Sequence, residues 1–478
     1  MHESMMSLAQ AADFLRSRQV DCAVVGDEQV MIKRVHTDTR TLAAGDLFAA
    51  LRGDRFDAHD FLPQAAASGA VAAIAEHGLK EAGLSGLIVT DAKQALGQLA
   101  AAWRAQFDLP LIAVTGSNGK TTVTQMIASI LKALSSEHSS ATAGNLNNDI
   151  GVPLTLLRLR AHHQIAVIEL GMNHPGEISY LAALTQPTVA VVNNAQREHQ
   201  EFMHTVEAVA LENGSVISAL TNTGVAVFPS DDAYTTLWRG LAQERSQVCF
   251  SSGAIPAEVT AQAEWQDAAW RVRLATPLGS ASCKLSIAGR HNVKNALAAA
   301  AAALGAGVPL ACIAEGLDAF EAVKGRSRAL RVELKGKTHN VIDDTYNANP
   351  DSVRAAIEVL AELPAPHLLV LGDMGEVGDQ GPEFHAEIGE YAAECGIESL
   401  LCVGELMRYG AAVFPGARHF GGVESLIAAV LADLTQYRSV LVKGSRFMKM
   451  ERVVHAIESA TSECSGNLQN NKETAHAA

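Results

Sequence analysis

Six apolar segments of this 478-residue chain each end in a cluster of polar and glycine residues, and this repeated pattern strongly constrains the fold. Three lie mid-chain, at residues 111–115, 165–170 and 189–192, and end in TGSNGKTT, ELGMNHPGE and NNAQREH. Three lie nearer the C-terminus, at 341–343, 368–371 and 440–442, and end in DDTYNANPDS, GDMGEVGD and KGSR. Helical patterns separate them, which predicts mostly parallel sheets with helices on both faces. Because ligands bind outside the carboxyl ends of such strands, we expect a cleft between two α/β domains to hold the chemistry.

Length and pattern divide the chain into three α/β blocks and a tail, since 478 residues exceed what one core supports. We predict a small N-terminal α/β domain at residues 1–108, a central doubly wound ATPase domain of P-loop type at 109–322, and a C-terminal Rossmann-like α/β domain at 323–461. In the first block, the alanine-rich residues around 60–76 predict a helix. Residues 462–478 are polar and lack periodicity, which predicts a disordered tail.

Composition argues against several classes of protein. The net charge of −15 disfavours a nucleic-acid partner, which needs a basic face. Seven scattered cysteines without a CxxC pair fit a reducing compartment. Residues 296–314 carry no charge, but Gly305, Gly307 and Pro309 indicate a buried helix and its turn, not a membrane span. With no signal-peptide pattern at the N-terminus, we expect a cytoplasmic protein without membrane insertion.

The segment TGSNGKTT has the composition of a phosphate-binding loop. It follows a strand and opens a helical pattern, so backbone N–H groups at the helix start can approach an anion. Lys120 would neutralise phosphate oxygens, and the hydroxyl of Thr121 would reach Mg²⁺. Val114 stands where the usual loop has an early glycine, which indicates a variant loop. The alternative is a tight turn with a surface lysine.

Two residues at strand ends could contribute to a metal site. Glu169 ends the second central strand, where a carboxylate facing the phosphate loop could hold Mg²⁺, a cation that prefers oxygen ligands. His199 follows the third strand. On its own, such a histidine is more often a core or capping residue, and imidazole is an unusual magnesium ligand.

Other polar clusters are candidate ligand sites. Asn292 and Asn295 could read an adenine edge, although capping of the alanine-rich helix is the simpler interpretation. Residues 343–352 hold more polar groups than the one helix N-cap needed there, expected at Asp351 or Ser352.

The cluster KGSR, at residues 443–446, adds cations suited to a carboxylate. In the first block, residues 37–40 could equally bind an anion or form a turn.

Taken in order along the chain, these clusters resemble those of the Mur ligase family. The resemblance extends from Thr37 to about Glu451, and TGSNGKTT is similar to the family's short nucleotide loop, which accounts for the missing glycine. The segments GNLNNDIGVP, ELGMNHPGEI and DDTYNANPDS look most like the family member that adds D-alanyl-D-alanine (D-Ala-D-Ala).

The resemblance implies three domains and an ATP-dependent amide ligase. D-Ala-D-Ala would be joined to UDP-MurNAc-tripeptide, giving UDP-MurNAc-pentapeptide, ADP and phosphate, with ATP and Mg²⁺ as cofactors. A carboxylate is a poor electrophile, so transfer of the γ-phosphoryl group would first make an acyl phosphate, which the dipeptide amine then attacks. The protein would mainly position the reactants and neutralise charge. We expect a monomer. Diaminopimelate and lysine remain open as the third residue of the tripeptide.

The resemblance also implies residue roles. The ATP phosphates would contact Gly116, Ser117, Asn118, Gly119, Lys120, Thr121, Thr122 and Arg326. Adenine would face Asn292 and Asn295, and the ribose Asp344. Mg²⁺ would be held by Thr121, Glu169 and His199. The uridine nucleotide would meet Thr37, Asp38, Thr39 and Arg40, whereas Tyr346, Asn347 and Asn349 would line the cleft near ATP and the dipeptide. The catalytic set would be Lys120, Glu169, His199 and Arg326.

One departure from the family concerns a lysine, carbamylated in many members, that follows the histidine near the second Mg²⁺. The stretch VEAVALENGSVI contains no lysine, and Asn213 falls at that position. The neighbouring Glu212 is already a carboxylate, although one helical step turns a side chain by about 100°. Our hypothesis is that Glu212 or a bound anion replaces the carbamate.

Two alternative functions stay open from the sequence. The chain could be another ATP-dependent amide ligase of this architecture, adding a different amino acid or acting on a folate. It could instead be an ATP-hydrolysing regulator or transporter partner. Polar clusters at strand ends in two domains argue against the second, because a regulator needs no acceptor site.

Overall fold

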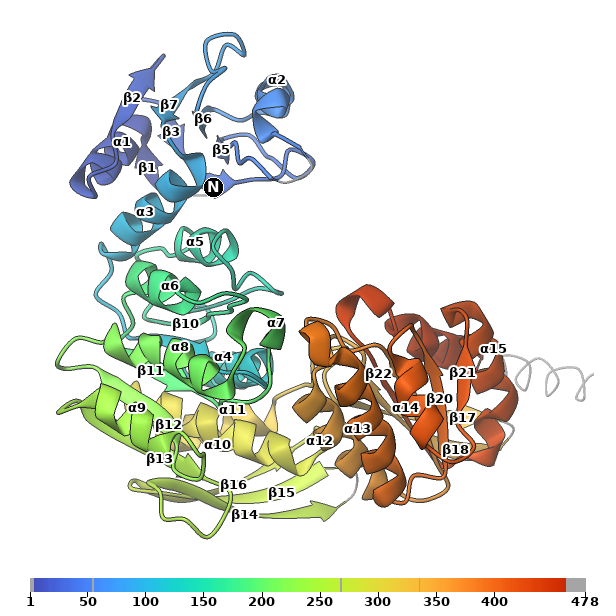
Figure 1. Cartoon of the computed structure of the whole chain (residues 1–478). Helices are drawn as coiled ribbons and strands as arrows, with labels where there is room; N and C mark the ends of the chain where they lie inside the picture. The colour runs from blue at the N-terminus through green and yellow to red at the C-terminus, as the bar shows by residue number, and fades with distance from the viewer. Residues whose placement is uncertain (1–3, 54–55, 267–268, 335, 461–478) are drawn as a thin grey trace, which may run out of the picture.

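The computed structural model describes residues 4–53, 56–266, 269–334 and 336–460. Three parts, each built on an α/β sheet, form a bent molecule in which the N-terminal part lies at one end and the C-terminal part at the other (Figure 1). The predicted tail, residues 462–478, lies outside the described residues. The domain bounds near residues 108 and 322 remain our proposal.

The N-terminal part holds a five-stranded sheet and a two-stranded one. The larger sheet has the order β2 (Cys22–Val25), β7 (Ser85–Val89), β6 (Ala72–Ala75), β5 (Asp46–Ala49), β4 (Arg34–His36), with only β2 antiparallel. The smaller sheet pairs β1 (Met6–Ser7) with β3 (Met31–Ile32). The helices are α1 (Leu8–Ser17), α2 (Leu62–Ala67) and α3 (Ala92–Arg104), and α3 packs on α1 and also on helices of the central part.

The predicted helix around residues 60–76 is partly wrong. A short 3-10 helix (Ala58–Phe61) and α2 are followed by Gly69 in a left-handed conformation (φ 97°), and residues 72–75 form strand β6. All four strand residues are buried. Alanine favours helices by itself, but here burial between two neighbouring strands overrides that propensity.

The central sheet is doubly wound around the strand that precedes the phosphate loop. Its order is β16 (Gly279–Leu285), β15 (Ala269–Thr276), β14 (Val259–Gln266), β13 (Ser246–Ser251), β12 (Val225–Pro229), β11 (Val189–Val192), β8 (Leu111–Thr115), β10 (Ile165–Glu169), β9 (Ser139–Ala141). From β14 to β9 the strands are parallel. The helices are α4 (Lys120–Ser135), α5 (Gly151–Leu156), α6 (Glu177–Thr185), α7 (Gln200–Met203), α8 (Val206–Ser218), α9 (Thr235–Ala242), α10 (Arg290–Gly305) and α11 (Leu310–Asp318).

Strand β8 explains why both faces of this sheet are covered. All five of its residues are buried. Ile112 and Val114 join a core with α4, α10 and α11, whereas Leu111 and Ala113 join the opposite core with α6 and α8. Strands buried on both faces read as continuous apolar runs, which is the pattern seen in the sequence.

Helix α10 confirms the interpretation of the alanine-rich segment. Residues 296–303 are completely buried, and a turn at Gly307 leads into α11. Small side chains let α10 pack closely on α4 and on strands β12 and β13. Within the described residues, no helix is long and apolar enough to cross a membrane.

The C-terminal part is a second, mostly parallel α/β sheet. Its order is β17 (Arg328–Leu334), β18 (Lys337–Asp344), β22 (Ser439–Lys443), β19 (His367–Gly372), β20 (Ser399–Val403), β21 (Arg418–Phe420), with β17 antiparallel. The helices are α12 (Pro350–Ala361), α13 (Gly381–Glu394), α14 (Met407–Val413) and α15 (Val423–Asp433). The polar clusters therefore follow adjacent parallel strands in both sheets, as predicted.

Candidate active site

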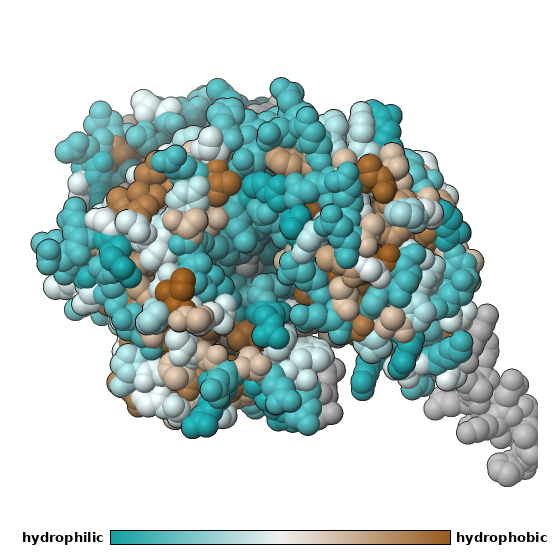
Figure 2. Space-filling model, turned by 60° about the horizontal axis from the view of Figure 1, so that its bottom comes forward, coloured by the Kyte–Doolittle hydropathy of each residue, from teal (hydrophilic) through white to brown (hydrophobic). Residues whose placement is uncertain are grey.

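One large cavity collects the polar clusters of the central and C-terminal sheets. Its volume is about 1560 Å³. Figure 2 shows the molecule hollowed there, with mostly hydrophilic residues around the hollow. The cavity is lined by these predicted residues: Ser117, Asn118, Gly119, Lys120, Thr121, Thr122, Glu169, His199, Asn292, Asn295, Arg326, Asp344, Tyr346, Asn347 and Asn349. The structure thus brings together residues that are far apart in sequence.

The loop between β8 and α4 requires glycine at two positions. Gly119 has φ 80° and a Cβ there would lie 2.5 Å from Oδ1 of Asn295. Gly116 has φ 133° and a Cβ would lie 3.0 Å from Asn193. Helix α4 starts at Lys120 without a side-chain cap, so its first N–H groups are free to meet an anion, as the phosphate-loop prediction requires.

Amides from the segment after β11 hold this loop in place. Asn194 Oδ1 accepts a hydrogen bond from the N–H of Asn118 (2.8 Å), and Asn193 Nδ2 donates to the Asn118 carbonyl (2.7 Å). The N–H of Gln196 donates to Ser117 Oγ (2.9 Å). These supporting roles were not predicted from the sequence, although the run NNAQ after a strand was their signal.

Lys120 is turned back onto its own loop and onto an acidic neighbour. Its Nζ donates to the carbonyls of Gly116 (2.6 Å) and Ser117 (3.1 Å) and to Oε1 of Glu198 (2.6 Å). The glutamate was not singled out from the sequence, although it directly precedes His199. The ammonium group lies where a phosphate on the loop would need a cation.

Thr121 and Glu169 lie in contact, as expected of two ligands of one cation. Thr121 Oγ1 donates to Glu169 Oε1 (3.0 Å), and Asn147 Nδ2 donates to the same oxygen (2.7 Å). Glu169 is only 1% exposed, and its Oε2 is buried without a hydrogen-bond partner in the described residues. A hydroxyl and a free carboxylate oxygen are ligands that Mg²⁺ prefers, so these residues fit a magnesium ion.

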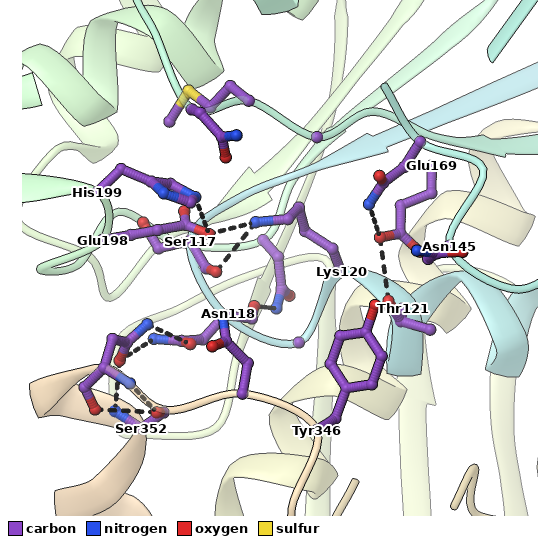
Figure 3. A pocket seen from close by; sticks show the side chains of 18 of the residues that line it. Ser117, Asn118, Lys120, Thr121, Asn145, Glu169, Glu198, His199, Tyr346 and Ser352 are labelled. Carbon is purple, nitrogen blue, oxygen red and sulfur yellow. Dashed lines mark hydrogen bonds and ion pairs between the residues drawn. The ribbon is translucent and has the colours of Figure 1, made fainter. Parts of the chain in front are cut away.

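His199 lies apart from that pair. Figure 3 shows Lys120 between the pair Thr121–Glu169 and the pair Glu198–His199. The imidazole Nε2 is 3.3 Å from Oε1 of Glu198, and Nδ1 is 2.5 Å from Oε2 of Glu376. Burial disfavours its charged form, but the two carboxylates outweigh burial and raise the pKa of His199 to about 9. His199 is thus bound to two carboxylates other than Glu169, and its role as a metal ligand stays a prediction.

The C-terminal wall of the cavity is organised around Lys443. Its Nζ donates to Asp344 Oδ2 (2.6 Å) and to the carbonyl of Asn347 (2.8 Å). Burial opposes the charge on Asp344, but Lys443 outweighs it and lowers the pKa of this carboxyl group. The guanidinium of Arg326 stacks over the ring of Tyr346, with its central carbon 4.1 Å from the ring centroid.

Asn349 has two structural roles that the sequence did not predict. It is the N-cap of α12, in a capping box with Ser352, so the expectation of a cap at Asp351 or Ser352 was wrong by two or three positions. Its Nδ2 also donates to Oδ1 of Asn118 (2.9 Å), which joins the phosphate loop to the C-terminal part.

Asn292 and Asn295 belong to a buried amide chain that lines the cavity. Asn193 donates to Asn295 (2.9 Å), Asn295 donates to Asn292 (2.8 Å), and Asn292 donates to the Ala288 carbonyl (2.7 Å). The N-cap of α10 is Gly289, with no side-chain cap. The simpler interpretation of these asparagines, as helix caps, is therefore wrong.

Residues 37–40 do not line the cavity. They follow β4 in the N-terminal part, and Asp38 accepts hydrogen bonds from the backbone and the guanidinium of Arg40 (3.0 and 2.7 Å). These bonds hold the pKa of Asp38 at about 2. The turn interpretation is thus correct. The nucleotide-binding role stays a prediction.

The structure contradicts the hypothesis that Glu212 replaces the family's carbamate. Both of its oxygens accept hydrogen bonds at the start of α6, from the N–H of Gly176 (2.9 Å) and of Ile178 (2.8 Å). Asn213 is fully buried, and its Oδ1 accepts from Thr115 Oγ1 (2.7 Å) and the N–H of Gly116 (3.1 Å). Neither side chain lines the cavity.

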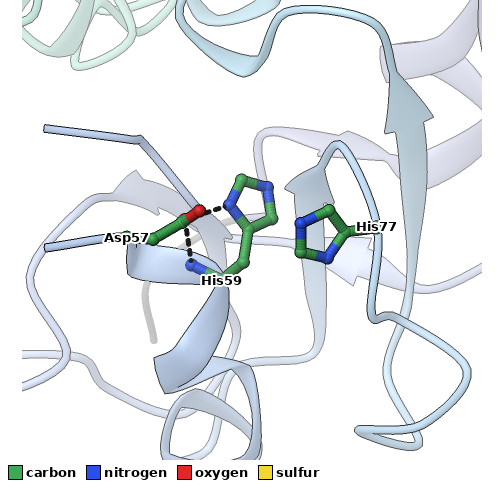
Figure 4. A group of neighbouring side chains, drawn as sticks. All are labelled: Asp57, His59 and His77. Carbon is green, nitrogen blue, oxygen red and sulfur yellow. Dashed lines mark hydrogen bonds and ion pairs between the residues drawn. The ribbon is translucent and has the colours of Figure 1, made fainter.

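A second cluster of potential metal ligands lies in the N-terminal part: Asp57, His59 and His77 (Figure 4). His59 Nε2 accepts from the N–H of Glu76 (2.9 Å), so Nδ1 carries the proton and donates to Asp57 (2.5 Å). Both ring nitrogens of the buried histidine are used by the protein itself. We therefore interpret this cluster as a structural contact.

Comparisons with known proteins agree with this site. The Mur ligase middle domain matches residues 114–303, the Mur ligase glutamate ligase domain 330–446, and the Mur ligase family catalytic domain 31–104. The chain is 39% identical over 456 residues to the UDP-N-acetylmuramoyl-tripeptide–D-alanyl-D-alanine ligase of Escherichia coli (strain K12), covering 95% of this chain and 98% of the relative. The chain belongs to the Mur ligase family.

Solved structures narrow the comparison within that family. MurF from Acinetobacter baumannii (crystal structure I) superposes with a TM-score of 0.86 at 36% identity, covering 94% of this chain and 98% of that one. MurF ligase from Thermotoga maritima, in complex with ADP, gives a TM-score of 0.78 at 25% identity, covering 90% of this chain and 98% of that one.

Proposed function

We propose that this chain is the ATP-dependent ligase that joins D-Ala-D-Ala to UDP-MurNAc-tripeptide, giving UDP-MurNAc-pentapeptide, ADP and phosphate for peptidoglycan synthesis. The observation that carries the proposal is that a phosphate loop and the cluster DDTYNANPDS line one cavity. Relatives that match almost the whole chain carry the same activity in their names.

The cavity walls suit the two halves of this reaction. The central wall offers a helix N-terminus and Lys120 for the phosphates of ATP, and Thr121 and Glu169 for Mg²⁺, which would shield phosphate charge. Arg326 and Lys443 on the C-terminal wall add cations where anionic groups would meet. Activation of the tripeptide carboxylate as an acyl phosphate needs this neutralisation, because the carboxylate and the γ-phosphate repel each other.

The remaining assignments follow from position. Asn292 and Asn295 would face adenine, and Asp344 the ribose, because all three line the cavity beyond the loop. Tyr346, Asn347 and Asn349 would lie near the dipeptide. Thr37 to Arg40 would contact the uridine nucleotide, from the N-terminal part. His199 would join the metal-binding set after releasing its proton.

We further propose a cytoplasmic monomer. The six cysteines in the described ranges are free, which fits a reducing compartment. The proposed reaction also uses ATP and a nucleotide-linked precursor as substrates.

Release of ADP tests the function. Purified protein would be incubated with ATP, Mg²⁺, D-Ala-D-Ala and UDP-MurNAc-tripeptide, and each component would be omitted in turn. We expect ADP release to require both organic substrates, to accompany a UDP-pentapeptide product, and to fall about 10²-fold or more in Lys120→Ala. ADP release that does not depend on the dipeptide would indicate an ATPase without ligation. Activity with a different amino acid or a folate in a substrate panel would indicate another ligase.

A further inference from the structure

Glu198 is a buried carboxylate with one oxygen unused. The residue is 8% exposed, and its Oε1 is bound to Lys120 (2.6 Å) and lies 3.3 Å from the His199 ring. Its Oε2 is buried and has no hydrogen-bond partner in the described part of the chain. Glu198 also lines the cavity, so the free oxygen belongs to the site and not to a closed core.

Binding of nucleotide would take away one of the two cations near Glu198, the ammonium group of Lys120. Lys120 lies on the phosphate loop, and a phosphate bound there would compete with Glu198 for the ammonium group. Only the protonated ring of His199 would then remain to balance this buried carboxylate, and phosphate oxygens would increase the negative charge around it. A divalent cation placed between Glu198 and the nucleotide would restore the balance.

We propose that Glu198 is an oxygen ligand of a divalent cation separate from the one that Thr121 and Glu169 hold. The two carboxylates lie on opposite sides of Lys120 (Figure 3), so one ion is not expected to serve both. Glu198 thereby takes the role that the sequence suggested for Glu212, whose oxygens are bound to the start of α6. This inference rests on the proposed use of ATP by the same site.

Manganese binding tests this assignment directly. Mn²⁺ would be titrated into the full-length protein with ADP, and bound ions would be counted by electron paramagnetic resonance in the wild type and in Glu198→Gln. We expect two ions per chain in the wild type. Glu198→Gln should weaken one of them at least ten-fold and leave the other unchanged. Glu169→Gln should weaken the ion at Thr121 and leave the ion at Glu198 unchanged.

Two further variants make the result interpretable. Glu201→Gln changes an exposed glutamate three residues away and should bind both ions like the wild type. Glu198→Asp keeps the negative charge and should retain the second ion more tightly than Glu198→Gln does. If Glu198→Gln fails to fold, as judged by circular dichroism, the comparison of Glu198→Asp with the wild type takes its place.

The outcomes that contradict the inference are distinct. Two ions bound normally by Glu198→Gln, with only ADP affinity changed, would mean that Glu198 serves solely as the partner of Lys120. ADP bound with a single ion in the wild type would overturn this inference and leave the proposed function intact. A wild-type protein that binds no ADP would overturn both.

Discussion

Arg197 and Asp351, 154 positions apart in the chain, are joined by three hydrogen bonds between the central and C-terminal parts. The Arg197 N–H donates to Asp351 Oδ2 (2.8 Å), and Nε and Nη2 donate to Oδ1 (3.0 and 2.7 Å). The same guanidinium donates twice to Glu387 (2.7 and 3.0 Å). The segment that holds Lys120 through Glu198 is thus fastened to helices α12 and α13 of the C-terminal part.

Loss of this contact should loosen the packing of the C-terminal part against the central part. The two side chains are about a quarter exposed (25% and 23%). We therefore expect Arg197→Ala to weaken the contact between the central and C-terminal parts by about 2 kcal/mol, which lies in the lower part of the range for hydrogen bonds to charged groups. The radius of gyration measured by small-angle scattering should rise, and kcat/KM should fall roughly ten-fold. Arg452→Ala, which removes an exposed pair with Glu424, is the control and should change neither quantity. An Arg197→Ala protein as compact and active as the wild type would contradict this role.

Substitution of the second loop glycine should impair nucleotide binding. In Gly119→Ala, the new Cβ would lie 2.5 Å from Asn295 and the residue would keep an unfavourable positive φ. We expect ADP affinity, measured by isothermal titration calorimetry, to fall at least ten-fold. Gly240→Ala is the control, because the new methyl group would meet no atom within 4 Å apart from its chain neighbours and the backbone of its own helix, α9. Equal affinity in both variants would mean that the loop does not bind phosphate.

Removal of the carboxylate charge at Glu169 should raise the magnesium requirement. Glu169→Gln keeps the shape of the side chain but offers a weaker ligand beside Thr121. We expect the Mg²⁺ concentration for half-maximal activity to increase at least ten-fold. Glu137→Gln, an exposed site two residues beyond α4, should behave like the wild type. An unchanged magnesium profile would exclude Glu169 as a ligand.

The Asp344–Lys443 pair should stabilise the protein in a pH-dependent way. The folded-state pKa of Asp344 lies below its ordinary value of 3.8, so its contribution is complete above that pH and is lost as pH falls through the folded pKa. Asp344→Asn should lower the free energy of unfolding by about 3 kcal/mol at pH 7, since Lys443 stays buried without its partner. In urea denaturation, the difference from wild type should shrink below pH 4. A difference that grew on acidification would have the wrong sign.

Local patterns predicted the sheets well because strands buried on both faces are continuous apolar runs. The run at residues 111–115 became β8 without any shift in its bounds. The strand at residues 72–75 was missed because alanine favours helices, and the sequence alone does not show that this segment is buried between two strands.

The site was predictable only where its signal is local. Lys120 and Thr121 follow a glycine loop, and Glu169 ends a strand, so all three could be named from the sequence. The partners of Arg197 and Asn118 come from residues 351 and 349, and no local pattern links them. Glu198 was overlooked for the same reason, since its importance comes from its contact with Lys120.

Transfer of oxygen from the tripeptide to phosphate tests the central claim most directly. UDP-MurNAc-tripeptide labelled with ¹⁸O in the carboxylate that is joined would be converted with ATP, Mg²⁺ and D-Ala-D-Ala, and the released phosphate would be examined by mass spectrometry. The proposed acyl phosphate predicts one ¹⁸O atom in each phosphate released, because the carboxylate oxygen leaves with the phosphoryl group. Phosphate released without ¹⁸O would contradict activation of the carboxylate by this site.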